Sequence, residues 1–215
     1  MLKSINEPEL IDSPGTGISL PAPKFTSSTS IEEAILNRRS ARDYLDKAIT
    51  LEQLGQLLWA GQGINRPESG KRTAPSAGAR YPLEFSVAAR DVEGLLAGLY
   101  KYIPDGHELM LTTRAALIDR LAEAAVNQDW IADAAAVLVI SAVFQRTTSR
   151  YGQRGERYVK MDVGIAAQNV YLQAESLGLG TVFVGAFDDD QVHSVLGLPL
   201  EERPLCLLPI SWPVS

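Results

Sequence analysis

The spacing of apolar and polar residues predicts two capped amphipathic helices in the first third of the chain. The first helix follows Ser30, with Glu33 three residues later as a capping box. The second follows Thr50, with Gln53 in the same position, and its leucines recur at three- and four-residue intervals until Gly61. The chain from there to position 80 is dense in Gly, Pro and basic residues, which indicates a loop.

Continuous and alternating apolar runs predict the strands. Residues 137–143 are apolar without interruption, which is typical of a strand buried on both faces. Pro104-Asp105-Gly106 indicates the turn of a hairpin. Pro209 interrupts the last apolar run and favours an edge strand, because proline has no N–H to donate to a neighbour. The other predicted strands cover residues 83–87, 100–103, 108–112, 181–184 and 205–212.

One long helix dominates the second half of the chain. Residues 158–177 are apolar nearly all round the predicted helix, so we expect it to be buried or to lie at a subunit interface. Gly178 is the expected C′ residue of this helix. Shorter helices are expected over residues 114–126 and between Asp188 and Gly197.

Strands and helices do not alternate as βαβ units, so the expected class is α+β. We expect residues 1–29 to form an irregular N-terminal arm and residues 30–215 to form the folded domain. The first twelve residues lack the apolar segment of a secretory signal, and no apolar run approaches the roughly 20 residues of a membrane helix. A soluble cytoplasmic protein without a membrane partner is therefore predicted.

Charge and metal-ligating residues narrow the function. A net charge of −6 argues against nucleic acid as a partner. Locally, residues 146–160 hold five cations and one acid, Glu156, so this stretch either faces an anionic ligand or is a solvated helix face. The single cysteine, Cys206, excludes an internal disulfide. Only two histidines, His107 and His193, are present, and no metal site is predicted.

Three short runs carry the candidate chemistry. The arginine run (residues 38–42) ends a helix, where guanidinium groups bind phosphate or stabilise the helix C-terminus. The Ser76 run (residues 75–82) consists mainly of small residues, which let backbone amides approach a ligand but also suit a plain turn. The Gly185 run (residues 184–188) permits a close backbone approach or a bend at a strand end.

The order and spacing of these runs resemble the FMN-dependent nitroreductase family from about Leu20 to Trp212, and most closely its SagB-type dehydrogenase branch. That branch includes oxidases of azoline rings in modified peptides. The resemblance implies a mostly antiparallel central sheet flanked by helices, in an intertwined homodimer with FMN at the interface. It implies FMN contacts from Arg38, Arg39, Ser40, Arg42, Pro75, Ser76, Ala77, Gly78, Val184, Gly185 and Ala186.

The resemblance also implies separate roles within the cofactor site. Arg38 and Ser40 match residues that hold phosphate and ribityl oxygens, and Arg42 matches one that reaches the pyrimidine edge of the flavin. A backbone N–H at Gly185 or Ala186 is implied near flavin N5, the atom that accepts hydride.

Two positions depart from the family pattern. Ala79 stands where many nitroreductases have an asparagine that bonds the pyrimidine ring, although the SagB-type branch commonly has this run. The family often places a cation after the last strand, whereas this sequence has none after Arg203. Phosphate binding is therefore expected to rest on Arg38 and Arg39, with help from Arg72 or the cluster around Arg154.

Three functions are compatible with these residues. The first is ping-pong transfer of hydride from NAD(P)H through flavin to a small electrophile such as a nitroaromatic or a quinone. The second is oxidation of peptide thiazolines or oxazolines with oxygen as acceptor. Those oxidases are thought to use a Lys-Tyr pair, whereas this chain has Arg150-Tyr151, and a guanidinium stays protonated. The third is a non-catalytic flavin-binding partner subunit.

No side chain is assigned as the catalytic group, because flavin itself supplies the reactivity. Tyr151 and Tyr102 are the candidates that the azoline oxidases suggest. Asp162, on the long helix, is expected to pair with an arginine rather than to act as a base.

Overall fold

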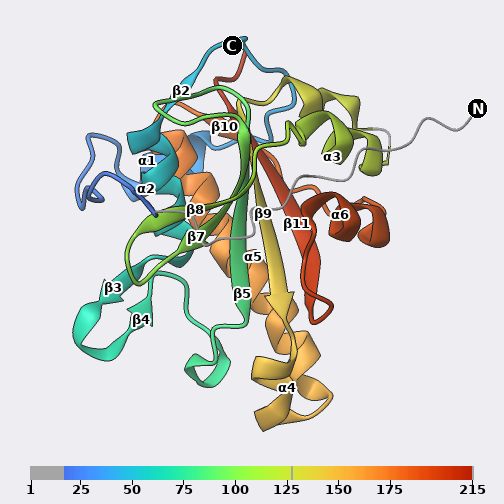
Figure 1. The fold of residues 1–215 in the computed structure, drawn as a ribbon. Coiled ribbons are helices and arrows are strands. Elements are labelled where there is room, and N and C mark those ends of the chain that lie inside the picture. The colour runs from blue at the N-terminus through green and yellow to red at the C-terminus, as the bar shows by residue number, and fades with distance from the viewer. Residues whose placement is uncertain (1–16, 127, 215) are drawn as a thin grey trace, which may run out of the picture.

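A single antiparallel sheet organises the protein (Figure 1). The structure is a computed structural model that describes residues 17–126 and 128–214. Seven strands lie in the order β1-β8-β7-β5-β9-β11-β10, and every neighbouring pair is antiparallel. Their bounds are β1 (Ile18–Ser19), β5 (Leu83–Ala89), β7 (Gly98–Ile103), β8 (Glu108–Thr113), β9 (Ala136–Val143), β10 (Gly180–Thr181) and β11 (Glu202–Ser211).

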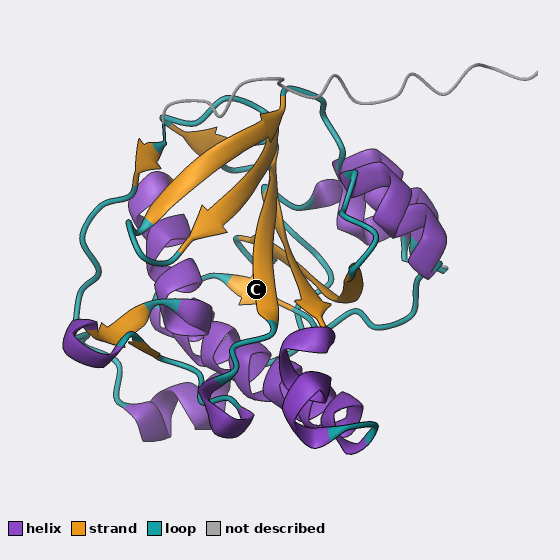
Figure 2. Cartoon of the chain, turned by 60° about the horizontal axis from the view of Figure 1, so that its bottom comes forward, coloured by secondary structure: helices purple, strands orange, loops and turns teal. Residues whose placement is uncertain are grey.

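Helices cover both faces of the sheet, as Figures 1 and 2 show. One face packs against α2 (Leu51–Gln62) and α5 (Arg154–Ser176), and α1 (Ile31–Asn37) lies on α5. The other face packs against α3 (Ile118–Ala124) and α6 (Asp189–Leu196). The predicted α+β class and the mostly antiparallel sheet flanked by helices are confirmed. The shorter elements are α4 (Gln145–Tyr151), the 3-10 turns Pro67–Ser69, Ala77–Ala79 and Asp129–Asp133, a parallel pair of β2 (Ile49–Thr50) with β6 (Val92–Glu93), and an antiparallel pair of β3 (Ile64–Arg66) with β4 (Lys71–Arg72).

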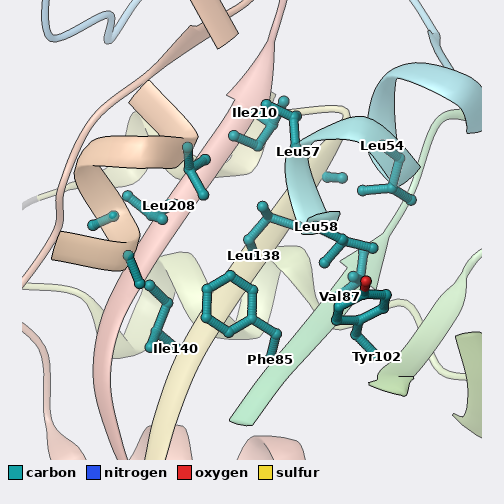
Figure 3. Close-up of a cluster of buried hydrophobic side chains, with 14 of the residues drawn as sticks. Leu54, Leu57, Leu58, Phe85, Val87, Tyr102, Leu138, Ile140, Leu208 and Ile210 are labelled. Atoms are coloured by element: carbon teal, nitrogen blue, oxygen red, sulfur yellow. The ribbon is translucent and has the colours of Figure 1, made fainter. Parts of the chain in front are cut away.

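Alternation of side chains along the central strands divides the core into two layers. Phe85 and Val87 on β5 join the cluster under α2 and α5, whereas Ala88 joins the cluster under α3 and α6. Figure 3 shows the first cluster, with Phe85 beside Leu138 and the leucines of α2 above them. Because the central strands are buried on both sides, their apolar runs are continuous in the sequence.

The predicted helix caps at Ser30 and Thr50 are confirmed, although the cap at Ser30 lacks the reciprocal bond from Glu33 that completes a capping box. The Ser30 hydroxyl accepts the Glu33 N–H, and Thr50 and Gln53 form a reciprocal capping box. At the C-terminal end of α5, the predicted C′ residue Gly178 has a positive φ of 71°, a conformation that glycine adopts without steric cost.

Several predicted boundaries were wrong. The N-terminal arm is not wholly irregular, because Ile18–Ser19 pairs with β8 and extends the sheet; residues 1–16 lie outside the described part. The predicted loop over residues 61–80 contains the β3–β4 hairpin. The helix expected from residue 114 begins at Ile118, and the long helix begins at Arg154 rather than at residue 158.

The last strand is not at the edge of the sheet, contrary to the prediction from Pro209. β11 lies between β9 and β10, and Pro209 pairs with Val137. On the side of β11 away from β9, Leu207 exchanges both backbone hydrogen bonds with Val184. The backbone nitrogen of Pro209, two residues later, faces this same side of the strand. The missing N–H therefore falls where β10 has already ended, which is why a proline is tolerated there.

The long helix α5 has apolar residues on its inner face and on part of its outer face. Its inner face is buried against the sheet and α2. On its outer face Met161 is 48% exposed and Ile165 is 41% exposed, and a Cβ at Gly164 would meet no atom within 4 Å. The described chain thus leaves an apolar stripe of α5 uncovered. No helix of the described residues is long and apolar enough to cross a membrane.

Candidate active site

The arginine run and the Gly185 run meet at one tyrosine of α5. Ser40 forms a parallel bridge with Thr181, and the Ala41 N–H donates to the Thr181 carbonyl at 3.0 Å. The Tyr171 hydroxyl lies 3.4 Å from the Ser40 hydroxyl and accepts the Phe183 N–H at 2.6 Å. Tyr171 therefore holds both runs in a fixed position relative to each other.

The three arginines of the first run differ in what they contact. The Arg39 guanidinium folds back and donates to the carbonyls of Leu36, Asn37 and Arg38, so it caps the C-terminus of α1. Arg38 instead lies with its guanidinium carbon 5.4 Å from the centre of the Tyr171 ring. Within the described residues Arg38 has no carboxylate partner, so its guanidinium N–H groups can receive a phosphate.

Arg42 reaches in a different direction. Its guanidinium carbon lies 5.8 Å from the centre of the Trp130 ring, and a weak cation–π contact can hold it there. The side chain is exposed and, in the described chain, forms no ion pair. It can therefore offer a positive charge to the edge of a bound ring.

The Gly185 run presents backbone donors to solvent. Val184 is paired with Leu207, and the Ala186 carbonyl accepts from the Val126 N–H and the Gln128 side chain. The N–H groups of Gly185 and Ala186, however, find no acceptor among the described residues. Both residues are exposed, and the bonds to the Ala186 carbonyl hold the backbone here in place. Such donors are suited to an electronegative atom of a planar ligand.

The Ser76 run is a strained turn. Gly78, Ala79 and Tyr81 have φ values of 61°, 51° and 45°. Two of these residues are not glycine, and a left-handed conformation costs such residues of the order of 1 kcal/mol or more each. The Ser76 hydroxyl accepts the Tyr81 N–H at 3.0 Å and closes the turn. The small side chains of Ser76, Ala77 and Gly78 leave its backbone accessible, as the sequence predicts.

Contacts from α4 hold this turn at the end of the sheet. The Arg80 guanidinium donates to the Arg146 carbonyl at 2.8 Å. The Tyr151 hydroxyl lies 2.5 Å from the position that a Cβ on Gly78 would take, so only glycine fits there without movement. The structure thus brings the candidate Tyr151 to the Ser76 run. Figure 1 shows α4 and the segment before β5 at the same end of the sheet.

Asp162 is the buried polar group beneath this turn. Its side chain is 5% exposed, and Oδ2 has no hydrogen-bond partner. Burial raises the pKa of this carboxyl, while the Ser76 hydroxyl and the Ala77 N–H, which face it, act in the opposite direction. The prediction that Asp162 pairs with an arginine was wrong. The carboxylate faces the Ser76 run instead.

The other candidates lie apart from these clusters. Tyr102 is buried in the core, and its hydroxyl is bonded to Nδ1 of His107 at 2.9 Å, so no substrate contacts it. Arg72 donates to the Gln62 side chain at 2.7 Å and stacks on Tyr81. Burial lowers the pKa of its guanidinium. Arg72 is thus already engaged inside the protein and is not presented to a phosphate near Arg38.

The three runs form two separate clusters on one chain. The arginine and Gly185 runs are anchored at Tyr171, whereas the Ser76 run is anchored at Asp162. Nine helical residues separate these anchors, which corresponds to about 13.5 Å along α5. Sequence reasoning missed both anchors, since an aspartate and a tyrosine on a buried helix face give no sign of what they contact.

Comparison with known proteins identifies the family. A model described as the nitroreductase family matches residues 35–212. A protein of Methanocaldococcus jannaschii named as a nitroreductase is 48% identical over 180 residues, which cover 84% of this chain and 89% of that protein. The chain therefore belongs to the nitroreductase family and is an oxidoreductase.

Further similarities agree with this assignment. The crystal structure of a nitroreductase from Ralstonia eutropha JMP134 has a TM-score of 0.84 and 30% identity, covering 100% of this chain and 97% of that one. An NADPH-flavin oxidoreductase of Vibrio harveyi is 30% identical over 78% of this chain and 59% of its own length. The Escherichia coli microcin synthetase McbBCD structure gives a TM-score of 0.71 and 25% identity, covering 91% and 77% of the two chains.

The buried carboxylate gives a pH-dependent prediction. A raised pKa in the folded state means that ionisation of Asp162 opposes folding, so its contribution to stability falls as the pH rises above the ordinary carboxyl range near 3.8. Asp162→Asn removes this effect. We expect the variant to gain unfolding free energy relative to the natural protein between about pH 4 and pH 8, measured by urea unfolding of the flavin-free protein. The control Asp133→Asn, at an exposed position, should have the same pH dependence of unfolding free energy as the natural protein. If Asp162→Asn also has that pH dependence, the conclusion that burial of Asp162 costs stability is wrong.

Proposed function

We propose that this chain is an FMN-dependent oxidoreductase with NAD(P)H as electron donor and a small electrophile, such as a nitroaromatic or a quinone, as acceptor. The observation that carries the proposal is that Tyr171 contacts both the Arg38 guanidinium and the Phe183 N–H. Phe183 lies two residues before Gly185, and the N–H groups of Gly185 and Ala186 have no acceptor among the described residues. When bound, FMN supplies two-electron chemistry at N5 of its ring. Donor and acceptor use the same face of the site in turn, as in a ping-pong mechanism.

Arg38 and Ser40 have the chemistry to hold the polar end of FMN. Arg38 offers several N–H donors on a planar fork, which suits a phosphate dianion. The Ser40 hydroxyl is exposed and contacts only Tyr171, so it remains available to a ribityl oxygen. Arg39, which caps α1, contributes charge rather than a direct contact in this arrangement.

The Gly185 run supplies the electrostatic part of the mechanism. N–H groups that are already oriented need no reorganisation when negative charge develops at the atom they face. Gly185 leaves room for this approach, because a Cβ there would meet only the Phe183 ring, at 3.4 Å. Arg42 adds a positive charge that favours an anionic reduced ring.

We infer that the complete site is assembled by two copies of the chain. The Ser76 run is anchored at Asp162, about 13.5 Å along α5 from Tyr171. In the proposed site, the Ser76 run of a second copy meets the flavin that is held at the Tyr171 cluster. The exposed stripe of Met161 and Ile165 gives such a copy an apolar surface, and Phe183, 41% exposed, lies at its Tyr171 end. A homodimer with FMN at the interface satisfies both observations.

The named relatives support the cofactor and the donor. The Vibrio harveyi relative is an NADPH-flavin oxidoreductase by name, which favours flavin and a nicotinamide donor for this chain. Membership of an oxidoreductase family argues against a non-catalytic partner subunit. The cytoplasmic location predicted from the sequence, which is part of this proposal, would provide a supply of reduced nicotinamide.

Azoline oxidation is the second candidate function. The position of Tyr151 against Gly78 favours it, because the Arg150-Tyr151 pair then lies beside a run that we assign to the flavin. The likeness to the microcin synthetase structure is further support. The guanidinium of Arg150 cannot act as a base, so Tyr151 would have to serve alone. Nitroaromatic reduction needs no such group, and we therefore place it first.

The different positions of Arg38 and Arg39 give a matched test of phosphate binding. A charge-assisted contact contributes about 1.5–3 kcal/mol, so Arg38→Ala should weaken FMN binding roughly ten- to 150-fold. Arg39→Ala removes the same charge but only a helix cap, and should weaken binding less than about fivefold. Fluorescence titration of the flavin-free variants measures both. Equal losses in the two variants would show that charge alone, not the Arg38 contact, is responsible.

Gly185→Val tests the proposed N5 contact. The side chain has room in the free protein, so the fold should persist, but it would separate the backbone donor from the ring. Flavin reduction by NAD(P)H, followed at 450 nm in a stopped-flow experiment, should slow about 100-fold, the usual loss for one oriented donor. Gly185→Ala is the control and should lose much less. A valine variant that reduces flavin at the natural rate would remove the Gly185 run from the site.

Charge on the exposed stripe should disrupt the dimer. Ile165→Asp places a carboxylate in the proposed interface, whereas Leu200→Asp places one at a residue that is 93% exposed and outside the stripe. Sedimentation should show the first variant as a monomer with weakened FMN binding and the second as a dimer with normal binding, because ligand that binds only the dimer stabilises it. A monomeric natural protein with full FMN occupancy would overturn the shared site.

A further inference from the structure

A basic patch lies where α4 turns into α5. We define it as Arg150, Arg154 and Arg157, which are all exposed. None of the three has a carboxylate partner within the described residues. The surrounding stretch, residues 146–160, holds five cations and only Glu156 as an acid, a balance of +4 in a chain whose net charge is −6. The positive charge of the protein is thus concentrated here, where it attracts anions.

Two tyrosines hold the patch in place. The Arg150 guanidinium lies 5.5 Å from the centre of the Tyr151 ring. Arg154 donates through Nε to the Tyr158 hydroxyl at 2.8 Å and lies 5.8 Å from the centre of that ring. The two rings pack edge to face with centroids 5.2 Å apart. Because these contacts use only part of each guanidinium, the remaining N–H groups stay free for a ligand while the arginines lose less entropy on binding it.

The patch borders the proposed cofactor site. A nitrogen of the Arg150 guanidinium lies 3.3 Å from the position of a Cβ on Gly78. Arg154 and Arg157 precede Met161 by seven and four residues, so they continue the same outward side of α5 as the apolar stripe. An anion bound at the patch would therefore lie next to the Ser76 run and at the edge of the proposed dimer interface.

We propose that the basic patch binds the 2′-phosphate of NADPH and makes the enzyme select NADPH over NADH. This inference rests on the proposed function, since it assigns a docking site for the electron donor. A phosphate monoester carries up to two negative charges and three acceptor oxygens, which suits two guanidinium forks, whereas NADH has an uncharged hydroxyl at that place. The half-buried Tyr151–Tyr158 pair offers an aromatic surface for the adenine next to it.

The phosphate of FMN is a poorer occupant of the patch. In the proposed shared site the phosphate is assigned to Arg38 of one copy, whereas the patch borders the Ser76 run, which meets the flavin from the other copy. Within one chain the patch is also remote from Arg38, because Arg154 precedes Tyr171 by seventeen helical residues, or about 25 Å along α5. The patch lies instead at the Ser76 end of the proposed site, where a long dinucleotide can extend outward from the ring. Its position therefore favours the donor over the cofactor.

A binding measurement tests the patch without any turnover. Calorimetric titration of the FMN-loaded protein with adenosine 2′,5′-bisphosphate and with 5′-AMP should show at least about tenfold tighter binding of the bisphosphate. The double variant Arg150→Gln/Arg154→Gln should lose this difference. The control Arg66→Gln/Arg114→Gln, which removes the same charge from exposed arginines elsewhere, should keep it. Equal binding of the two nucleotides by the natural protein, or an unchanged preference in the patch variant, would overturn the proposal.

Flavin reduction separates this proposal from the proposed function. The natural protein should be reduced by NADPH with an apparent Kd about tenfold below that for NADH, and the patch variant should lose this advantage while its Kd for NADH changes less than twofold. Reduction by both donors without any preference would contradict the patch and leave the proposed function standing. Selective bisphosphate binding without reduction by either donor would support the patch and contradict the proposed function.

Discussion

The packing of α5 against the sheet is the constraint on which the site depends. Its inner face is buried over the central strands, and α2 fixes it from the side. Such an interface does not slide by fractions of a turn, because interdigitated side chains fill it at the density of a solid. Tyr171 and Asp162 point from this helix toward different loops, so the helix sets where each loop stands. Three runs that are remote in the sequence acquire fixed positions through one element.

The same helix explains why one chain holds two partial clusters. The two anchors lie nine residues apart on α5, and the loop at each anchor carries features that a simple turn does not require. The Ser76 run keeps two non-glycine residues at positive φ, and the Gly185 run leaves two N–H groups without an acceptor. Backbone strain of this kind persists where the surrounding structure fixes it, and exposed N–H groups without a protein acceptor are open to a ligand. In the proposed dimer, the exposed stripe of α5 near these anchors is the surface on which a second copy completes each site.

Local features of the fold were predictable, because the sequence encodes them within a few residues. The caps at Ser30 and Thr50 depend on side chains three positions apart, and the continuous apolar run of β9 reports burial on both faces. The edge prediction from Pro209 was wrong because a proline in a strand only requires that no neighbouring carbonyl needs its missing N–H. A neighbouring strand that ends early meets this requirement as well as an open edge does. That neighbour is remote in the sequence.

The sequence pointed to candidate site residues but not to their geometry. Composition and spacing pointed to the three runs, and the resemblance assigned them to one cofactor. Apart from the resemblance, nothing in the sequence distinguished Arg38 from Arg39. In the described residues the Arg38 guanidinium has no carboxylate partner, whereas that of Arg39 caps its own helix. Asp162 likewise appeared to need an arginine, because a buried carboxylate usually has a cationic partner; the turn it faces supplies a hydroxyl and an N–H instead.

The central claim is that this chain binds FMN non-covalently at a site shared by two copies. The most direct measurement is the absorption spectrum of the freshly purified protein, followed by heat release and identification of the pigment. The account predicts flavin bands near 370 and 450 nm, roughly as for free flavin, and release of FMN at one molecule per chain from a dimer. A colourless protein that takes up no FMN on reconstitution would contradict it.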